Sequence, residues 1–121
     1  MSVSVLAHAS LAFNLMCSGS FLADKELRPM SHVFRVDLAS GRFCIDDCAS
    51  TAPSASVSYG EIVFQDEVSR SGEVIYRSVN RESGLYYADR LTPQPRKKVV
   101  RTVTTATCES APFTGFPARR F

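Results

Sequence analysis

The residues of this chain best suited to chemistry are its four cysteines, Cys17, Cys44, Cys48 and Cys108. An even number of cysteines in a short chain favours a disulfide-stabilised domain that works in an oxidising compartment. Four cysteines allow three pairings, and the sequence alone does not choose between them. We favour Cys17 with Cys108 and Cys44 with Cys48. The middle two are close in sequence, and the outer two fall on terminal strands that a closed meander would bring together.

The segment from Cys44 to Cys48 offers a second interpretation, a thiol-redox pair. Its spacing is C-x-x-x-C rather than C-x-x-C, and no helix N-terminus follows to activate a thiol. Asp46 and Asp47 also disfavour a thiolate beside them. Structural zinc sites usually need two close cysteine pairs, and this chain has one. We therefore expect no metal and no cofactor, and keep a thiol-redox protein as an alternative function.

Acid–base chemistry has few candidates. The histidines are His8 and His32, and no G-x-S-x-G motif supplies a nucleophile. Asp46–Asp47 and Asp66–Glu67 are adjacent pairs, and neighbours on a strand face opposite sides, so neither pair forms a carboxylate dyad. We interpret His32 as a solvated strand end and these acids as solvated turn charges. The expectation is no catalytic residue and a protein that is not an enzyme.

Basic residues cluster at Arg96, Lys97, Lys98 and Arg101, and again at Arg119–Arg120. An acidic polymer could bind the first cluster only if its members shared one face, and alternate residues on a strand point apart. The net charge is +2, which is too small to indicate a nucleic-acid partner. No run of about 20 apolar residues predicts a transmembrane helix.

The elements that must position these residues are strands, because the apolar residues recur with period two from Phe13 onward. Turn residues such as Ala39-Ser40-Gly41 separate the alternating runs. The segment from Cys48 to Ser56 reads as a loop that carries Pro53. The strands are expected near Phe13–Phe21, His32–Leu38, Arg42–Ile45, Ile62–Phe64, Glu73–Asn80, Leu85–Leu91 and Lys97–Cys108.

This pattern predicts an all-β chain, an antiparallel meander of seven to eight short strands that forms a small barrel. A β-sandwich is the alternative. The aromatics Phe34, Phe64, Tyr76, Tyr86 and Tyr87 would fill the core of such a barrel or line a cavity for a small apolar ligand. The phenylalanine-rich C-terminal segment, residues 112–121, would cap one end of the barrel or dock a protein partner.

Residues 1–12 are interpreted as a degenerate or truncated signal segment, and residues 13–121 as a single disulfide-stapled β domain. The first sixteen residues carry no charge, and Ala7-His8-Ala9 has the form of a signal-peptidase site. A basic start is missing, so a first strand or a frayed terminus is the alternative interpretation.

Several segments resemble one group of proteins: Ala12–Gly19, Phe34–Leu38, Arg42–Cys44 with Cys48, and Cys108 followed by Pro112–Pro117 and Phe121. This group consists of small uncharacterised secreted or periplasmic proteins of proteobacteria that have four cysteines and a C-terminal GFP tripeptide in similar places. The resemblance implies export and disulfides, and no activity. We expect a periplasmic or extracellular, non-enzymatic binding or structural module, with a protein partner or a small apolar ligand.

Overall fold

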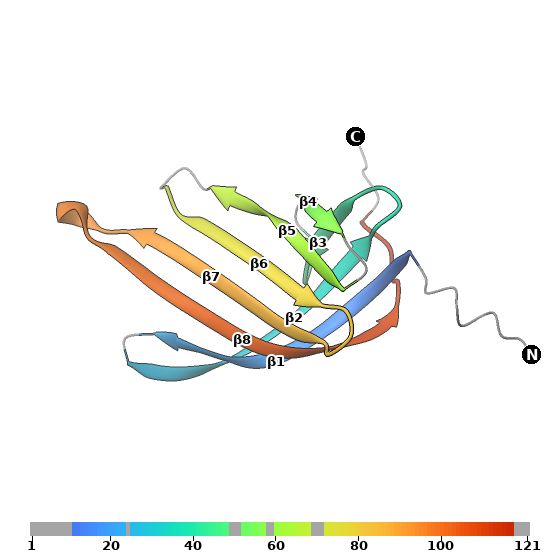
Figure 1. Cartoon of the computed structure of the whole chain (residues 1–121), viewed down its shortest axis with the longest axis horizontal. Coiled ribbons are helices and arrows are strands. Elements are labelled where there is room, and N and C mark those ends of the chain that lie inside the picture. Colours follow the sequence, from blue (N-terminus) through green and yellow to red (C-terminus); the bar gives the residue numbers. More distant parts are fainter. Residues whose placement is uncertain (1–10, 24, 49–51, 58–59, 69–71, 118–121) are drawn as a thin grey trace, which may run out of the picture.

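The protein forms one antiparallel β-sheet that closes on itself as a barrel, seen in a computed structural model that describes residues 11–23, 25–48, 52–57, 60–68 and 72–117 (Figure 1). Each strand pairs with the next, and the last strand returns to pair with the first. The strands are β1 (Ala12–Ala23), β2 (Glu26–Asp37), β3 (Arg42–Ile45), β4 (Ala52–Val57), β5 (Glu61–Val68), β6 (Val74–Asn80), β7 (Leu85–Pro93) and β8 (Val99–Pro112), with a short 3₁₀ turn, η1 (Pro95–Lys97), before β8. The prediction of an all-β antiparallel meander in a small barrel is confirmed.

Alternation of side chains explains why these segments become strands. In β8, Ala106 and Cys108 are buried, whereas their neighbours Thr105 and Thr107 are exposed. In β2, Phe34 and Val36 are buried and belong to the core. A period of two places every second residue inside the barrel, and the β-branched threonines and valines of β8 suit the extended backbone.

Two of the predicted boundaries were wrong. The segment expected to be a loop contains β4, which pairs with β5 through Ser56–Val63 and Val57–Ile62. Its sequence, APSASV, has small residues and no alternation, so the strand depends on pairing with its neighbour and not on a local pattern. Likewise β2 begins at Glu26, well before His32, because the chain turns back directly after Ala23 and pairs along the whole of β1.

The seam that closes the ring lies between β1 and β8. Cys17 stands directly opposite Cys108, and a disulfide joins them. Two residues along, Gly19 stands opposite Ala106, and the backbones approach so closely that a β-carbon on Gly19 would lie 2.1 Å from the Thr105 carbonyl oxygen. This position therefore requires glycine. On the other side of the ring, β3 and β4 are joined through Arg42–Pro53 and Phe43–Ala52.

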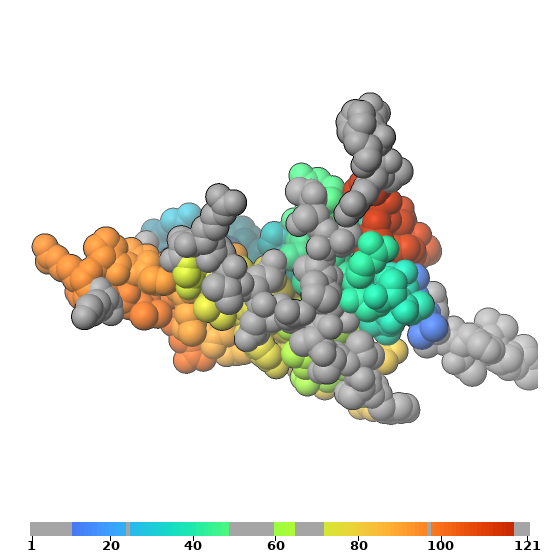
Figure 2. All heavy atoms as spheres, turned by 90° about the horizontal axis from the view of Figure 1, so that it is seen from above, coloured from blue at the N-terminus to red at the C-terminus, as the bar shows by residue number. Residues whose placement is uncertain are grey.

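The strands differ in length, and this shapes the ends of the barrel. β7 and β8 stay paired out to Pro93 and Val99, beyond the residues that pair with β6 and β1, and their connecting turn projects beyond the rest of the sheet (Figure 1). The space-filling view shows the same projection at one end of the molecule (Figure 2). The hairpins β1–β2 and β5–β6 turn at this end too, whereas the β6–β7 turn and residue 112 lie at the opposite end.

Candidate functional site

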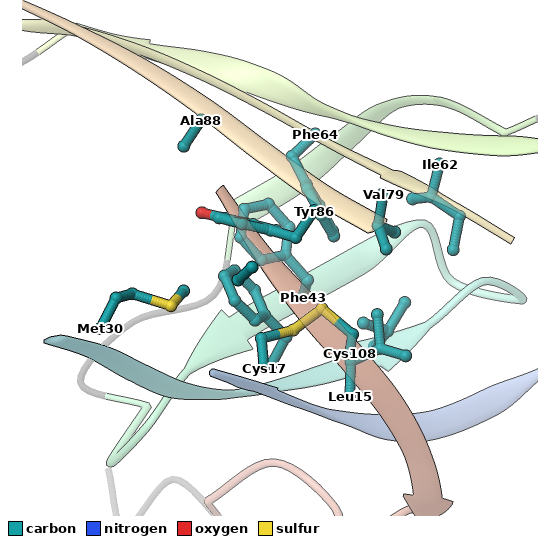
Figure 3. Close-up of a cluster of buried hydrophobic side chains, with 13 residues drawn as sticks. Leu15, Cys17, Met30, Phe43, Ile62, Phe64, Val79, Tyr86, Ala88 and Cys108 are labelled. Atoms are coloured by element: carbon teal, nitrogen blue, oxygen red, sulfur yellow. A yellow bond between two sulfur atoms is a disulfide. The ribbon is translucent and has the colours of Figure 1, made fainter. Parts of the chain in front are cut away.

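The middle of the barrel is filled by four aromatic side chains, which we call the aromatic plug: Phe34, Phe43, Phe64 and Tyr86. Their ring centroids lie 4.4 Å apart for Phe43 and Phe64, 5.5 Å for Phe34 and Phe64, and 5.3 Å for Phe34 and Tyr86. All four are buried, and the Cys17–Cys108 disulfide lies in the same cluster (Figure 3). The interior is therefore not one continuous channel, and any ligand site must lie to one side of this plug.

On one side of the plug lies a pocket of about 400 Å³, which we call the cup. It extends toward the end where the β7–β8 hairpin projects, since its lining includes Ala23 at the end of β1 and the paired residues Arg90 and Thr102. Figure 3 shows Met30 and Ala88 on this side, with the Tyr86 hydroxyl directed toward it. The lining comes from strands β1, β2, β6, β7 and β8, and consists of Phe21, Ala23, Pro29, Met30, Ser31, His32, Ile75, Arg77, Tyr86, Ala88, Arg90, Thr102 and Thr104.

The lining of the cup is about equally apolar and polar. Met30, Ala88 and Phe21 supply the apolar part. Arg77 lines the same pocket and is only 9% exposed, so its guanidinium is a buried cation with interactions inside the protein. Arg90 lies farther out, with Nε 3.8 Å from Glu73 Oε1. Apolar walls with a small number of placed polar groups are the usual make-up of a small-molecule site.

The imidazole of His32 lines the cup, and Asp46 holds it in place. Nδ1 of His32 lies 2.6 Å from Oδ2 of Asp46, and the Asp46 Oδ1 atom accepts a hydrogen bond of 2.9 Å from the Val33 amide. Both side chains are partly exposed, as expected for solvated residues, but His32 lies in the middle of β2 rather than at a strand end, and its pairing with Asp46 was not predicted. The antiparallel pairing of β2 with β3 brings them together across 14 residues, because Asp46 follows β3 directly and its amide donates to the Val33 carbonyl. Because Nδ1 is committed to the carboxylate, Nε2 is the nitrogen that can meet a ligand.

A larger pocket of about 890 Å³ lies on the other side of the plug. Most of its polar lining belongs to the β6–β7 turn, where several groups already accept or donate hydrogen bonds within the protein. Asn80 Oδ1 accepts hydrogen bonds from the amides of Glu82 and Ser83, and the Gly84 carbonyl accepts one from the Cys108 amide. These satisfied turn groups are less suited to a ligand than the converging side chains of the cup.

Both disulfides have the pairing that we favoured, Cys17–Cys108 and Cys44–Cys48, and they are consistent with an oxidising compartment. Cys44 is 2% exposed and Cys48 is 6% exposed. An attacking thiolate must reach a sulfur atom, so this buried bridge is a poor redox centre. In the described part of the chain, no group of three or more His, Cys, Asp or Glu side chains could hold a metal ion.

The basic cluster does not form one surface. Arg101 is held on β8 by the Asp89 carboxylate, with Nη2 2.7 Å from Oδ2, and it also donates to the Tyr87 hydroxyl. This hydrogen bond lowers the pKa of Asp89 and raises the pKa of Arg101. Arg96 and Lys98 lie instead on the exposed turn between β7 and β8. The arginines at 119 and 120 fall outside the described residues.

The C-terminal segment was expected to cap one end of the barrel, and Phe113 does line the larger pocket there, whereas residues 114–116 cross the outside of the barrel. Asn14 of β1 donates to the Thr114 hydroxyl at 3.0 Å and accepts from the Thr114 amide at 3.3 Å. Arg35 of β2 donates to the Gly115 carbonyl at 2.9 Å, and Arg42 of β3 lies over the Phe116 ring. The segment thus ties three neighbouring strands together, and no local pattern in the sequence predicts those partners. The predicted signal segment lies almost entirely outside the described residues.

Comparison with known proteins identifies no relative: no family model, no curated protein and no solved structure matches this chain. Among the described residues, no helix is long and apolar enough to span a membrane.

Proposed function

We propose that this chain is an exported, non-enzymatic binding protein that holds a small amphiphilic molecule in the cup. The observation that carries this proposal is the cup itself, a pocket of about 400 Å³ whose lining combines apolar side chains with polar ones, including a buried arginine. This volume falls in the range of about 300–1,000 Å³ typical of small-molecule sites. The expected ligand has an apolar body that contacts Met30 and Ala88, and one polar group within reach of the Arg77 guanidinium or of Nε2 of His32.

Export to a periplasmic or extracellular compartment is part of the same proposal. The two disulfides support it, since such bonds persist mainly in oxidising compartments. The resemblance to small exported proteobacterial proteins agrees with it. A stapled barrel would give the cup a fixed shape, which reduces the ordering cost of binding.

A fluorescent probe tests the binding proposal directly. N-phenyl-1-naphthylamine is small and apolar and fluoresces strongly outside water, and the chain has no tryptophan to interfere. The oxidised protein should bind it saturably at one site. Thr104 lines the cup and Thr105, its neighbour on β8, is exposed outside it, so Thr104→Phe and Thr105→Phe form a matched pair.

Thr104→Phe places a ring in the cup and should weaken probe binding at least about tenfold, which corresponds to about 1.4 kcal/mol. Thr105→Phe should leave the affinity unchanged. Circular dichroism and thermal melting establish that both variants are folded. If folded Thr104→Phe bound the probe as tightly as the parent protein, the cup would not be the binding site.

A further inference from the structure

The turn that projects between β7 and β8 concentrates the positive charge of the chain. Residues 90–101, which we call the basic tip, contain five of the 14 lysines and arginines and none of the 12 acidic residues. The rest of the chain therefore has a formal charge of −3, although the whole chain has +2. Arg90 forms an ion pair with Glu73, and Arg101 forms one with Asp89. Arg96 and Lys98, by contrast, are exposed at the turn. The excess positive charge thus lies at the outermost part of the projection.

Exposed aliphatic side chains stand among these cations. Val99 is 62% exposed, and Val100 and Leu91 are exposed as well. Val99 and Val100 are consecutive on β8, so they point to opposite faces of the ribbon. Because the hairpin projects from the barrel, the barrel core does not cover this apolar surface on its two faces. At the same end, the neighbouring β1–β2 hairpin exposes Leu22 and Leu27, which are cross-strand partners.

We propose that the basic tip docks on an anionic lipid bilayer, with Val99 and Val100 entering the interface and the Arg96 and Lys98 side chains contacting lipid headgroups. Charge complementarity selects an anionic partner. The aliphatic pair selects a bilayer over a nucleic acid or an acidic polysaccharide, because those polymers offer no apolar layer to bury it. The lining of the cup extends toward this same end, so docking would place the cup near the bilayer. The docking proposal goes beyond ligand binding in the cup and stands or fails independently of it.

Tryptophan substitution gives a direct measurement, because the natural chain has no tryptophan. Val99→Trp reports from the tip, and Leu85→Trp is the matched control, since Leu85 is 59% exposed next to the β6–β7 turn at the opposite end. The oxidised, full-length variants are mixed with vesicles of phosphatidylcholine alone or of equimolar phosphatidylcholine and phosphatidylglycerol. Emission from Val99→Trp should shift to the blue only with the anionic vesicles, and emission from Leu85→Trp should not shift.

Vesicle sedimentation then measures the electrostatic contribution to docking separately from the insertion of the valine side chains. Lys98→Gln should weaken binding to the anionic vesicles about fivefold, the effect of removing roughly 1 kcal/mol of attraction per cation near the surface. Arg81→Gln, in the turn at the opposite end, should have no effect, and added salt should weaken binding of the parent protein.

Three outcomes would overturn the proposal: no sedimentation with anionic vesicles, an equal shift for both tryptophan reporters, or equal binding to the two vesicle types. Binding to heparin without any shift of Val99→Trp on vesicles would replace the bilayer with an acidic polymer.

Discussion

Replacing Gly19 with alanine should strongly destabilise the barrel, because this residue lies at the seam where β1 meets β8. A β-carbon at this position would lie 2.1 Å from the Thr105 carbonyl oxygen and 2.5 Å from the Ala106 α-carbon. Both atoms belong to the β8 backbone, so no side-chain rotation can relieve the contact. The strands would have to separate by almost 1 Å to bring the closer contact to 3.0 Å.

Such a separation is opposed by the Cys17–Cys108 bridge, two residues away on each strand. Overpacking that moves backbone costs up to about 3 kcal/mol. For a domain of this size, 1 kcal/mol corresponds to roughly 4 °C, so the melting temperature should fall by about 12 °C. That loss is a large part of a typical stability of about 5–15 kcal/mol.

Thermal unfolding followed by circular dichroism under non-reducing conditions measures this effect. Gly60→Ala is the control, since a β-carbon there meets nothing within 4 Å, and it should change the stability by less than about 0.5 kcal/mol. If Gly19→Ala melted at the same temperature as the parent protein, β1 and β8 would not pair in this register.

Three further predictions concern the stability of the same barrel. Removing the long bridge with Cys17→Ala and Cys108→Ala should cost about 4–5 kcal/mol, against roughly 2 kcal/mol for the shorter bridge, and urea denaturation of both double variants compares them. The pKa of Asp89 is lowered below its ordinary value of 3.8 by its hydrogen-bonded arginine, so the carboxylate stabilises the fold above that pH and less as the pH falls through the lowered pKa. Asp89→Asn should therefore be less stable than the parent protein at neutral pH, and a difference in free energy of unfolding that persisted in strong acid would contradict this. Asn14→Ala should cost about 1–2 kcal/mol and speed hydrogen exchange at the Thr114 amide, while an unchanged exchange rate would show that the C-terminal segment is held elsewhere.

The sequence predicted the meander because local alternation was strong where one face of a strand is buried. Phe34 and Val36 in β2 are a clear example, and the turn at Gly41 has the positive φ that its glycine suggested. By contrast β4 has no alternation, since its small residues rely on β5 for pairing. Strands that depend on long-range partners leave little local signal.

The candidate site was harder to predict than the fold. The cup collects side chains from five strands, and neither Met30 nor Arg77 carries a motif in the sequence. The pair of His32 and Asp46 depends on the antiparallel pairing of β2 with β3 and on a positive φ at Asp46, directly after β3 ends. The five cations of the basic tip were visible in the sequence, but their projection from the barrel was not, because it follows from the unequal lengths of the strands.

The methionine methyl groups provide the most direct test of the proposal that the cup binds an amphiphile. Met30 lines the cup, whereas Met16 points outward from β1 and is exposed. In protein labelled with ¹³C at the methionine methyl groups, titration with dodecanoic acid should shift the NMR signal of Met30 in a saturable manner and leave that of Met16 in place. A Met30 signal that stayed fixed at saturating dodecanoic acid, or that moved no more than the Met16 signal, would contradict the proposed site.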